Sequence, residues 1–432
     1  FMKIFLGLDD TCGYYTQLQI GLKSLGIPCT LVNAFPNKRY SAKHAPESIA
    51  GKIVERIGRK TIVVGRGSFL RYCWIAAKGL SLLFLLLTSL PRYDVFIFSG
   101  GTTFLNSLDL WLLKFFKKKV IVVYHGSESR APYITPILLK KEGDFGLKEC
   151  IKETRAIKKR LKKIEHYADI IINNPNASHL HENKFINWHC IGIPFNCPRS
   201  SKSKKINSFL NNQCVIVHAP TRPGPKGSPL IEKAIKSLIK EGHNIKFLKL
   251  TGKSNAEVLE SIASCDFIVD ELYSDVLMAS LAGEAAMFGK PAIVGMYDYE
   301  NIKASFPKKD MIPPVLACSP EDVKQAIQKL IVDKEFRVHL GIQAKEFIQK
   351  QWNSEEVAKR FLLLVKNEIP ETWWFDPRNI RRLNGWGITE IKLKERLQDI
   401  INTYGPSALQ LSHNPVLEQA FLHFSKSNQK SC

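Results

Sequence analysis

Short apolar runs alternate with amphipathic stretches along most of the chain. Six runs in the first half are rich in Val, Ile and Phe and are short enough to be strands. They read MKIFLGL, PCTLV, TIVVG, YDVFIFSG, KVIVVYHG and ADIIINN. Helical patterns separate them, including residues 15–25 and the long basic stretch 147–166. Strands that alternate with helices predict a parallel sheet that is covered on both faces.

A second alternating series follows a break in composition. Residues 196–213, NCPRSSKSKKINSFLNNQ, have no apolar periodicity and are expected to form an interdomain linker. After them, the strands CVIVHA, IKFLKLTG, DFIVDEL and PAIVGM alternate with helices, and two more helices are expected within 321–365. The pattern predicts an α/β protein with two tandem doubly wound Rossmann-like domains, 2–195 and 214–365, that face a central cleft. Ligands in such folds bind beyond the carboxyl ends of the strands.

The segment after residue 365 has a different character. It begins NEIPETWWFDPRNIRRLNGWG, which places three tryptophans beside three arginines, and it continues with a helical pattern at 389–404. We expect the Trp373–Trp374 pair to pack against a neighbouring domain, because large aromatic rings bury much apolar area. The sequence therefore predicts a C-terminal helical tail, 366–432, that packs back on the body.

The turn after the first strand of the second series contains three prolines and two basic residues. In HAPTRPGPKGSPLIEKAIKSL, an amphipathic helix is expected at 229–241, with Ser228 as its cap. Backbone amides in the first turn of a helix lack intrahelical partners and favour anions. Arg222 and Lys226 add full charges there, which predicts a phosphate or diphosphate site. The stretch alone leaves open an ordinary strand–helix turn with solvated basic side chains.

A run of small residues opens a later helix of the same series. Ala279, Ser280, Ala282 and Gly283 would let a ligand lie against the start of that helix. Glu284 is the lone carboxylate of the run, and a carboxylate can accept two hydrogen bonds from a ribose diol. A partly exposed helix glutamate is the alternative.

The composition constrains the partners. The chain has 62 Lys and Arg against 40 Asp and Glu, a formal net charge of +22, which suits phosphates, an anionic membrane surface or an acidic polymer. It contains no zinc-finger spacing, RNA-recognition motif or basic zipper, so nucleic acid is not an expected partner. Ten cysteines are scattered without a CxxC pair, and no signal peptide is recognisable. Both features favour a protein of the cytoplasm with reduced thiols.

Two segments bear on membranes. Residues 74–90, WIAAKGLSLLFLLLTSL, are apolar over 17 residues, at the short end for a bilayer span, and Lys78 and Gly79 interrupt them. We expect a buried or membrane-resting helix rather than a crossing one. The basic run within 158–163 is typical of a solvated helix face, but beside an apolar helix it can also rest on anionic lipid. A peripheral position on the inner face of the membrane is therefore expected.

Several segments together resemble one enzyme family. HAPTRPGPKGSPLIEKAI, SNAEVLESIASCDFIVDEL and GEAAMFGKPAIV resemble the second domain of glycosyltransferases with the two-Rossmann (GT-B) architecture, most like the retaining family four group. TCGYYTQLQIGLKSLG and VVYHGSESR resemble the glycine loop and a strand end of its first domain. The resemblance covers residues 2 to 365 and rests on the order and spacing of the motifs.

The resemblance implies a function and a set of roles. It implies a hexosyltransferase-like enzyme that moves a sugar from a nucleotide-diphosphate sugar to a hydroxyl of a lipid-linked or polysaccharide acceptor. Lys226 and Arg222 would bind the donor diphosphate, with Gly13 letting it or the acceptor approach the backbone. Glu284 would hold the ribose hydroxyls, and His125 would lie near the transferred sugar. No cofactor and no metal are expected, because the chain has no GxGxxG motif after its first strand and no DxD motif.

One position departs from the family pattern. The family usually places a second glutamate eight positions before the equivalent of Glu284, where this chain has Val276. Either Asp275 serves as the catalytic carboxylate through a shift of one residue, or this branch lacks the contact. The second case leaves open a catalytically degenerate protein that only binds a glycan or a partner. The departure also leaves open whether the reaction retains or inverts the anomeric configuration.

Overall fold

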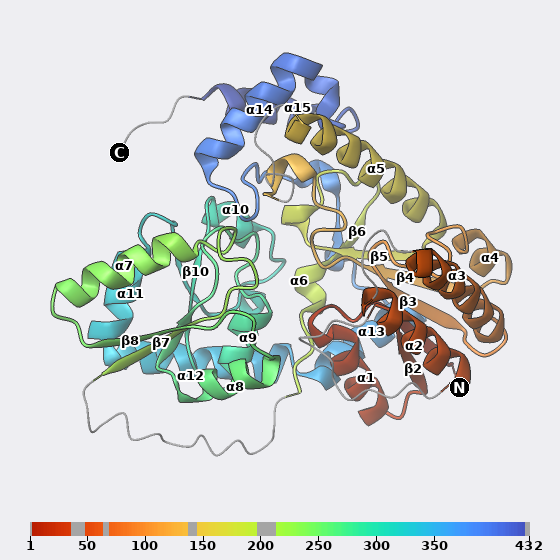
Figure 1. The fold of residues 1–432 in the computed structure, drawn as a ribbon, viewed down its shortest axis with the longest axis horizontal. Coiled ribbons are helices and arrows are strands. Elements are labelled where there is room, and N and C mark those ends of the chain that lie inside the picture. Colours follow the sequence, from red (N-terminus) through yellow and green to blue (C-terminus); the bar gives the residue numbers. More distant parts are fainter. Residues whose placement is uncertain (1, 36–47, 64–68, 137–144, 197–212, 428–432) are drawn as a thin grey trace.

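Two α/β lobes and a helical tail make up the protein (Figure 1). The computed structural model describes residues 2–35, 48–63, 69–136, 145–196 and 213–427. Each lobe is a doubly wound sheet with helices on both faces, so the predicted pair of Rossmann-like units is confirmed. The predicted linker falls almost wholly outside the described residues.

The N-terminal lobe is built on a seven-stranded sheet. Its strand order is β12-β6-β5-β4-β3-β1-β2, and every pair is parallel except β12–β6. The strands are β1 (Ile4–Leu8), β2 (Cys29–Asn33), β3 (Val95–Ser99), β4 (Lys119–Val123), β5 (Ile170–Asn173), β6 (Phe185–Asn187) and β12 (Trp374–Phe375). Its helices are α1 (Tyr14–Ser24), α2 (Ile49–Val63), α3 (Phe69–Ser89), α4 (Leu110–Phe115), α5 (Phe145–Tyr167) and α6 (Trp188–Ile191).

The C-terminal lobe has a five-stranded parallel sheet in the order β11-β10-β9-β7-β8. The strands are β7 (Cys214–His218), β8 (Ile245–Lys249), β9 (Phe267–Val269), β10 (Ala292–Gly295) and β11 (Leu316–Cys318). The helices are α7 (Ser228–Lys240), α8 (Asn255–Ser264), α9 (Ser280–Met287), α10 (Tyr299–Ala304), α11 (Val323–Val332) and α12 (Lys334–Gln351).

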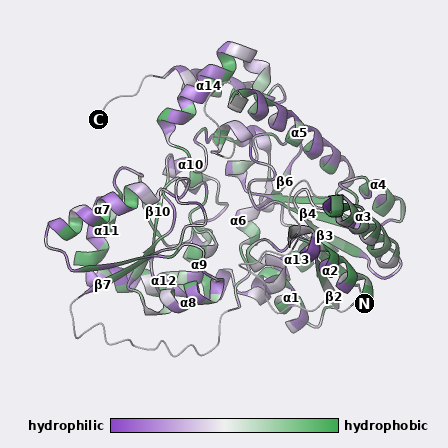
Figure 2. Ribbon diagram, viewed as in Figure 1, coloured by the Kyte–Doolittle hydropathy of each residue, from purple (hydrophilic) through white to green (hydrophobic). Residues whose placement is uncertain are grey.

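Burial on both sheet faces explains the continuous apolar strands. Alternate residues of β3, for example, join different cores: Phe96 and Phe98 face α3, α4 and α5, whereas Val95 and Ile97 face α1. Figure 2 shows the strands as mostly hydrophobic and the outer helix α5 as largely hydrophilic. A sheet that is covered on both faces requires this pattern, because neither row of side chains meets water.

The chain crosses between the lobes twice, and the two crossings are hydrogen-bonded to each other. The amide of Phe195 donates to the carbonyl of Trp352 at 2.8 Å, and the amide of Ser354 donates to the carbonyl of Phe195 at 2.9 Å. The following helix, α13 (Ser354–Lys366), packs on α1 of the N-terminal lobe. The chain therefore returns to that lobe near Asn353, and the predicted end of the second domain at 365 is too late.

The helices of the tail pack on the N-terminal lobe. Trp374 and Phe375 form β12, which pairs with β6 at the edge of the sheet. The helices α14 (Glu390–Tyr404) and α15 (Pro415–Lys426) contact each other, and α14 also contacts α5 (Figure 1). The apolar sides of both helices join the same core as β3 and β4.

Two expectations about local structure are wrong. TIVVG was expected to be a strand, but Thr61 continues α2, and its hydroxyl donates to the carbonyl of Ile57 one turn earlier at 2.9 Å. The range 321–365 holds three helices rather than two. Asp333 caps α12 and Asn353 caps α13, so two polar caps divide what reads as a continuous periodic pattern.

The contact between α1 and α13 gives a test of the packing. A Cβ atom at Gly21 would overlap the carbonyl oxygen of Ser354, which belongs to the backbone and cannot rotate away. We expect Gly21→Ala to destabilise the protein by about 1–3 kcal/mol. Gly79→Ala is the matched control in α3, because a Cβ there meets no atom within 4 Å. It should stabilise by about 0.5–1 kcal/mol. Urea denaturation followed by circular dichroism measures both, and equal shifts in one direction would contradict the close α1–α13 packing.

Candidate functional site

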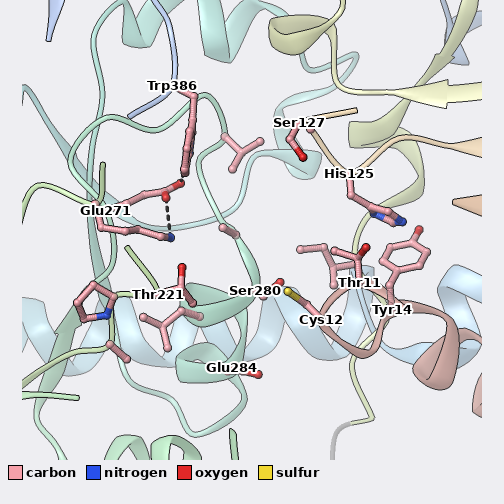
Figure 3. A pocket seen from close by; sticks show the side chains of 18 of the residues that line it. Thr11, Cys12, Tyr14, His125, Ser127, Thr221, Glu271, Ser280, Glu284 and Trp386 are labelled. Carbon is pink, nitrogen blue, oxygen red and sulfur yellow. Dashed lines mark hydrogen bonds and ion pairs between the residues drawn. The ribbon is translucent and has the colours of Figure 1, made fainter. Parts of the chain in front are cut away.

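A cavity of about 350 Å³ lies between the two lobes, at the carboxyl ends of their strands. Residues of both lobes and of the tail line it (Figure 3). The N-terminal wall carries Tyr14 and His125, and the C-terminal wall carries Lys226 and Glu284. Four of the six predicted site residues, His125, Asp275, Lys226 and Glu284, therefore meet around one space.

Glu284 lies on α9 with only 8% of its surface exposed. The capping box of Ser254 and Glu257 fixes the start of α8, so that Asn255 becomes the first helical residue. Its side-chain amide donates to Glu284 Oε1 at 2.7 Å. Burial raises the pKa of Glu284 to about 7, and the hydrogen bond from Asn255 opposes that rise. The carboxyl group is therefore half protonated near neutral pH, and new hydrogen-bond donors such as ribose hydroxyls would favour its ionised form.

Lys226 forms an ion pair inside the cavity. Its Nζ lies 2.6 Å from Glu271 Oε2, the contact dashed at Glu271 in Figure 3, and 3.4 Å from Asp270 Oδ1. Burial alone would lower the pKa of Lys226, but these two carboxylates outweigh it and hold the pKa above its ordinary value. The ammonium group is thus charged and faces the cavity, and an incoming anion has to share it with Glu271.

The start of α7 differs from the prediction. Gly227, in the left-handed region at φ 77°, is the N-cap, and Ser228 is the first helical residue. The Ser228 hydroxyl instead shares a 2.8 Å hydrogen bond with His218 Nε2. The first-turn amides are also occupied: Ser228 N–H donates to the carbonyl of Pro223 at 2.9 Å, and Leu230 N–H to that of Gly227 at 3.0 Å. The expectation of open amides at this helix end is therefore wrong, and only the charge of Lys226 remains for an anion.

A better-placed helix start is that of α9. Its N-cap, Ala279, has no polar side chain to cap the helix. Ala279, Ser280 and Leu281 all line the cavity. The small residues noted in the sequence thus let a ligand approach the start of this helix, where the backbone amide of Ala282 also interacts with the buried carboxylate of Asp270. Lys226 and the α9 N-terminus face the same space and complement each other as parts of an anion site.

Arg222 stands apart from the cavity wall. Its guanidinium carbon lies 5.1 Å from the centre of the Trp386 ring, and that of Arg130 lies 5.4 Å from the same ring. Trp386 lines the cavity and donates from Nε1 to Glu271 Oε1 at 3.3 Å. The tail thus contributes an aromatic side chain between cations of both lobes, within the range of cation–π attraction. The predicted diphosphate contact of Arg222 stays a prediction.

His125 lies opposite, at the end of β4. Burial lowers the pKa of His125 to about 4, so the imidazole is neutral at physiological pH. Its ring packs edge-on against Tyr14 and Tyr15, with ring centres 4.8 and 5.9 Å away. Among the described residues, Nε2 of this ring has no hydrogen-bond partner. This nitrogen is buried, so the part of the ring that lines the cavity is its apolar edge or face rather than an open hydrogen-bond acceptor.

Asp275 has another partner. Its carboxylate accepts from Arg130 Nε at 2.9 Å and also pairs with Nη2, and both side chains are almost fully buried. The backbone carbonyl of Asp275 accepts from the side-chain amides of Asn174 and Asn176, each at 3.3 Å. The structure therefore places Asp275 in a contact between the lobes, and a catalytic role for it stays a prediction.

Gly13 is the N-cap of α1, with φ 77°. It lines a neighbouring cavity between the lobes that it shares with Ser280 and Glu284, and a Cβ there would meet open space. The α1 N-terminus already has an anion, because Asp10 Oδ1 accepts from the amide of Tyr15 at 2.7 Å. Gly13 is thus placed for close approach of a ligand to the backbone, while the helix end itself is neutralised by Asp10.

Sequence reasoning missed four cavity residues. Glu271, Asn255 and Arg130 stood in quoted motifs, but nothing local marked them as partners of Lys226, Glu284 and Asp275. Trp386 comes from the tail, so only tertiary structure could place it. In the described part of the chain, no group of three or more His, Cys, Asp or Glu side chains is arranged to share a metal ion. Whether the reaction uses a metal stays a prediction.

The raised pKa of Glu284 predicts how stability depends on pH. Between its ordinary pKa of 4.5 and the folded value of about 7, the folded protein binds more protons than the unfolded chain, so stability falls as pH rises. We expect Glu284→Gln to remove this slope, because glutamine is neutral and can still accept from Asn255. At pH 8 the variant should be more stable by on the order of 2–3 kcal/mol. Thermal unfolding from pH 5 to pH 8 measures it, and parallel curves for the two proteins would refute the buried carboxyl group.

Comparisons with known proteins agree with the architecture. No protein-family model and no curated protein sequence matches the chain. Among solved structures, the trehalose-6-phosphate synthase OtsA superposes with a TM-score of 0.52 at 10% identity, covering 86% of this chain and 100% of that one. HepE from Anabaena, in complex with UDP-glucose, gives 0.47 at 13% identity, covering 85% and 100%. At such identities the likeness shows the fold alone, and that fold is the GT-B fold that the sequence predicts. The family four subgroup stays a prediction.

Proposed function

We propose that the chain is a nucleotide-sugar-dependent glycosyltransferase, hexosyl-transferring, that acts in the cytoplasm on a hydroxyl of a lipid-linked or polysaccharide acceptor. One observation carries the proposal: the cavity between the two lobes has Lys226 and Glu284 on one wall and His125 on the other. A nucleoside diphosphate needs a cation and a diol acceptor, and the acceptor hydroxyl needs a site opposite them. The GT-B fold places such groups on separate lobes.

The donor half of the proposal follows from charge and burial. Lys226 and the uncapped start of α9 receive the diphosphate, and Glu284 accepts hydrogen bonds from the ribose hydroxyls. As the glycosidic bond breaks, negative charge grows on the leaving diphosphate, so preorganised positive groups stabilise the transition state more than the ground state. Glu271 keeps the ammonium group of Lys226 in place until the diphosphate shares it.

The acceptor half rests on His125. A neutral imidazole on the cavity wall can lie against the sugar or acceptor without adding charge beside the reacting carbon. Closure of the lobes would align donor and acceptor, and alignment of this kind supplies much of the rate enhancement in two-substrate reactions.

A binding protein with the same fold is the rival. Val276 stands where the family has a glutamate, and Asp275 is paired with Arg130, so no carboxylate at either position is free to contact the sugar. Release of the nucleoside diphosphate from a nucleotide sugar, measured with and without oligosaccharide or lipid-linked acceptors, separates the two. Turnover that is abolished by Glu284→Ala supports the enzyme, and tight donor binding without turnover supports the rival.

The proposed contact between Lys226 and the diphosphate predicts that a variant at Lys226 loses affinity for nucleoside diphosphates but not for nucleosides. Lys226→Met should weaken binding of the best nucleoside diphosphate, chosen from UDP, GDP and ADP by thermal shift, by about tenfold to a hundredfold, the scale of a charged hydrogen bond. Binding of the corresponding nucleoside should not change, because it lacks the diphosphate. Lys233→Met, on the exposed side of α7, is the control. Calorimetric titration measures all of these affinities, and equal losses for nucleoside and diphosphate would refute the assignment of Lys226.

The proposed contact between Glu284 and the ribose predicts that a variant at Glu284 no longer distinguishes ribonucleotides from deoxyribonucleotides. The native protein should bind the ribonucleoside diphosphate more tightly than its 2′-deoxy or 3′-deoxy analogue, because the missing hydroxyl leaves Glu284 with an unused acceptor. In Glu284→Ala the ribo and deoxy ligands should bind equally. Discrimination that persists in the variant would place the ribose elsewhere.

A further inference from the structure

We propose that one face of the N-terminal lobe rests on an anionic lipid bilayer. This apolar face is formed by exposed side chains of α3 and of the α4 region, which are between 49% and 72% exposed: Leu70, Leu80, Phe84, Leu87, Trp111 and Phe115. Soluble surfaces carry single exposed apolar residues routinely, but a contiguous group marks an interaction site. The proposal does not depend on the glycosyltransferase assignment.

The residues of the apolar face belong to one layer of the fold. Buried side chains of α3, α4 and α5, such as Leu86, Leu113 and Leu161, join a single core with Phe96 on one side of the sheet. Right-handed crossovers from β2 through β5 place these helices in that order on the same side. Since the inner sides of α3 and α4 face the sheet, their exposed residues point outward together.

Helix α3 can lie on a membrane but cannot cross it in this fold. It is the one helix in the described residues that is long and apolar enough for a span, with 21 residues, a mean hydropathy of 1.6 and only 22% of its apolar window buried. Leu82, Leu85 and Leu86, in its second half, belong to the core of the lobe. Crossing a bilayer would remove them from that core. Resting on the surface buries the exposed side and leaves the core intact.

Positive charge borders the apolar face. Helix α5, which contacts α4, carries eight Lys or Arg against three Glu. Lys152, Arg155 and Lys159 on α5 are exposed, and so are Lys114 and Lys117 beside Phe115. Lysine is depleted at protein–protein interfaces, whereas apolar side chains ringed by Lys and Arg match the headgroup and acyl regions of anionic lipid. The charge pattern therefore favours a bilayer over a protein partner or a second copy.

Helix α3, which carries most of the apolar face, also contacts the loop that leads to the cleft. Lys78 of α3 lies 3.4 Å from the centre of the Phe35 ring and is close enough to Asp9 for the two charges to affect each other's pKa. Asp9 follows β1, and the next residues of that loop, Thr11 and Cys12, line the cavity. A bilayer on this face would therefore lie next to the N-terminal wall of the cavity.

Vesicle flotation with the full chain tests the proposal. We expect the native protein to float with vesicles that contain about 30% phosphatidylglycerol and not with pure phosphatidylcholine. Binding should weaken when salt rises from about 0.05 to about 0.5 M, because salt screens exposed charges. Leu80→Gln, Phe84→Gln and Leu87→Gln combined should reduce binding about tenfold or more, since apolar burial and charge are both needed for stable association. Glutamine keeps helix propensity.

A second triple variant tests whether removing exposed apolar side chains from any other surface has the same effect. Val332→Gln, Val338→Gln and Ile342→Gln remove three exposed apolar side chains from α11 and α12 of the other lobe and should leave flotation unchanged. Circular dichroism and thermal unfolding confirm that both triple variants fold. No flotation of the native protein, or equal loss in both variants, overturns the proposal. So does a native dimer that the α3 variant dissociates, because a second copy would then cover the face.

Discussion

The buried ion pair between Arg130 and Asp275 holds the two walls of the cleft in register. Each side chain is less than a tenth exposed, and each comes from a different lobe. Removing one partner of such a pair leaves an uncompensated buried charge, which costs about 3–5 kcal/mol. Arg130 follows the loop that begins at His125, and Asp275 precedes the small-residue start of α9. The pair therefore fixes the distance between the imidazole on one wall and the anion-binding groups on the other.

Burial acts on the three titratable groups of the cavity in different ways. It keeps His125 neutral, brings the pKa of Glu284 to about 7, and fails to neutralise Lys226 only because Asp270 and Glu271 lie beside it. One low-polarity space thus holds a neutral acceptor, a carboxyl group at its titration point and a permanent cation. A ligand whose negative charge lies between two hydroxyl-bearing groups would contact all three, and a nucleotide sugar, the proposed donor, has this arrangement.

The architecture could be predicted because a strand that is buried on both sheet faces appears in the sequence as a continuous apolar run. Every strand with four or more apolar residues was found, but a strand was also expected at TIVVG, where Thr61 continues α2, which ends at Val63. The strands β6, β11 and β12 are too short to show such a run. The anion site at α7 was inferred from a rule about helix ends, but Pro223 and Gly227 supply carbonyls that no spacing rule foresees. Contacts that bring distant segments together, such as Trp386 with Glu271, leave no local pattern.

The two crossings at Phe195 and Asn353 are hydrogen-bonded to each other, so any motion of one lobe against the other would have to bend both segments together. The tail joins the lobes a second time, where the amide of Gly387 donates to the carbonyl of Tyr273 at 2.8 Å and Arg382 donates to that of Ser274 at 2.9 Å. Opening the cleft would therefore require breaking these tail contacts as well as the pair between Arg130 and Asp275.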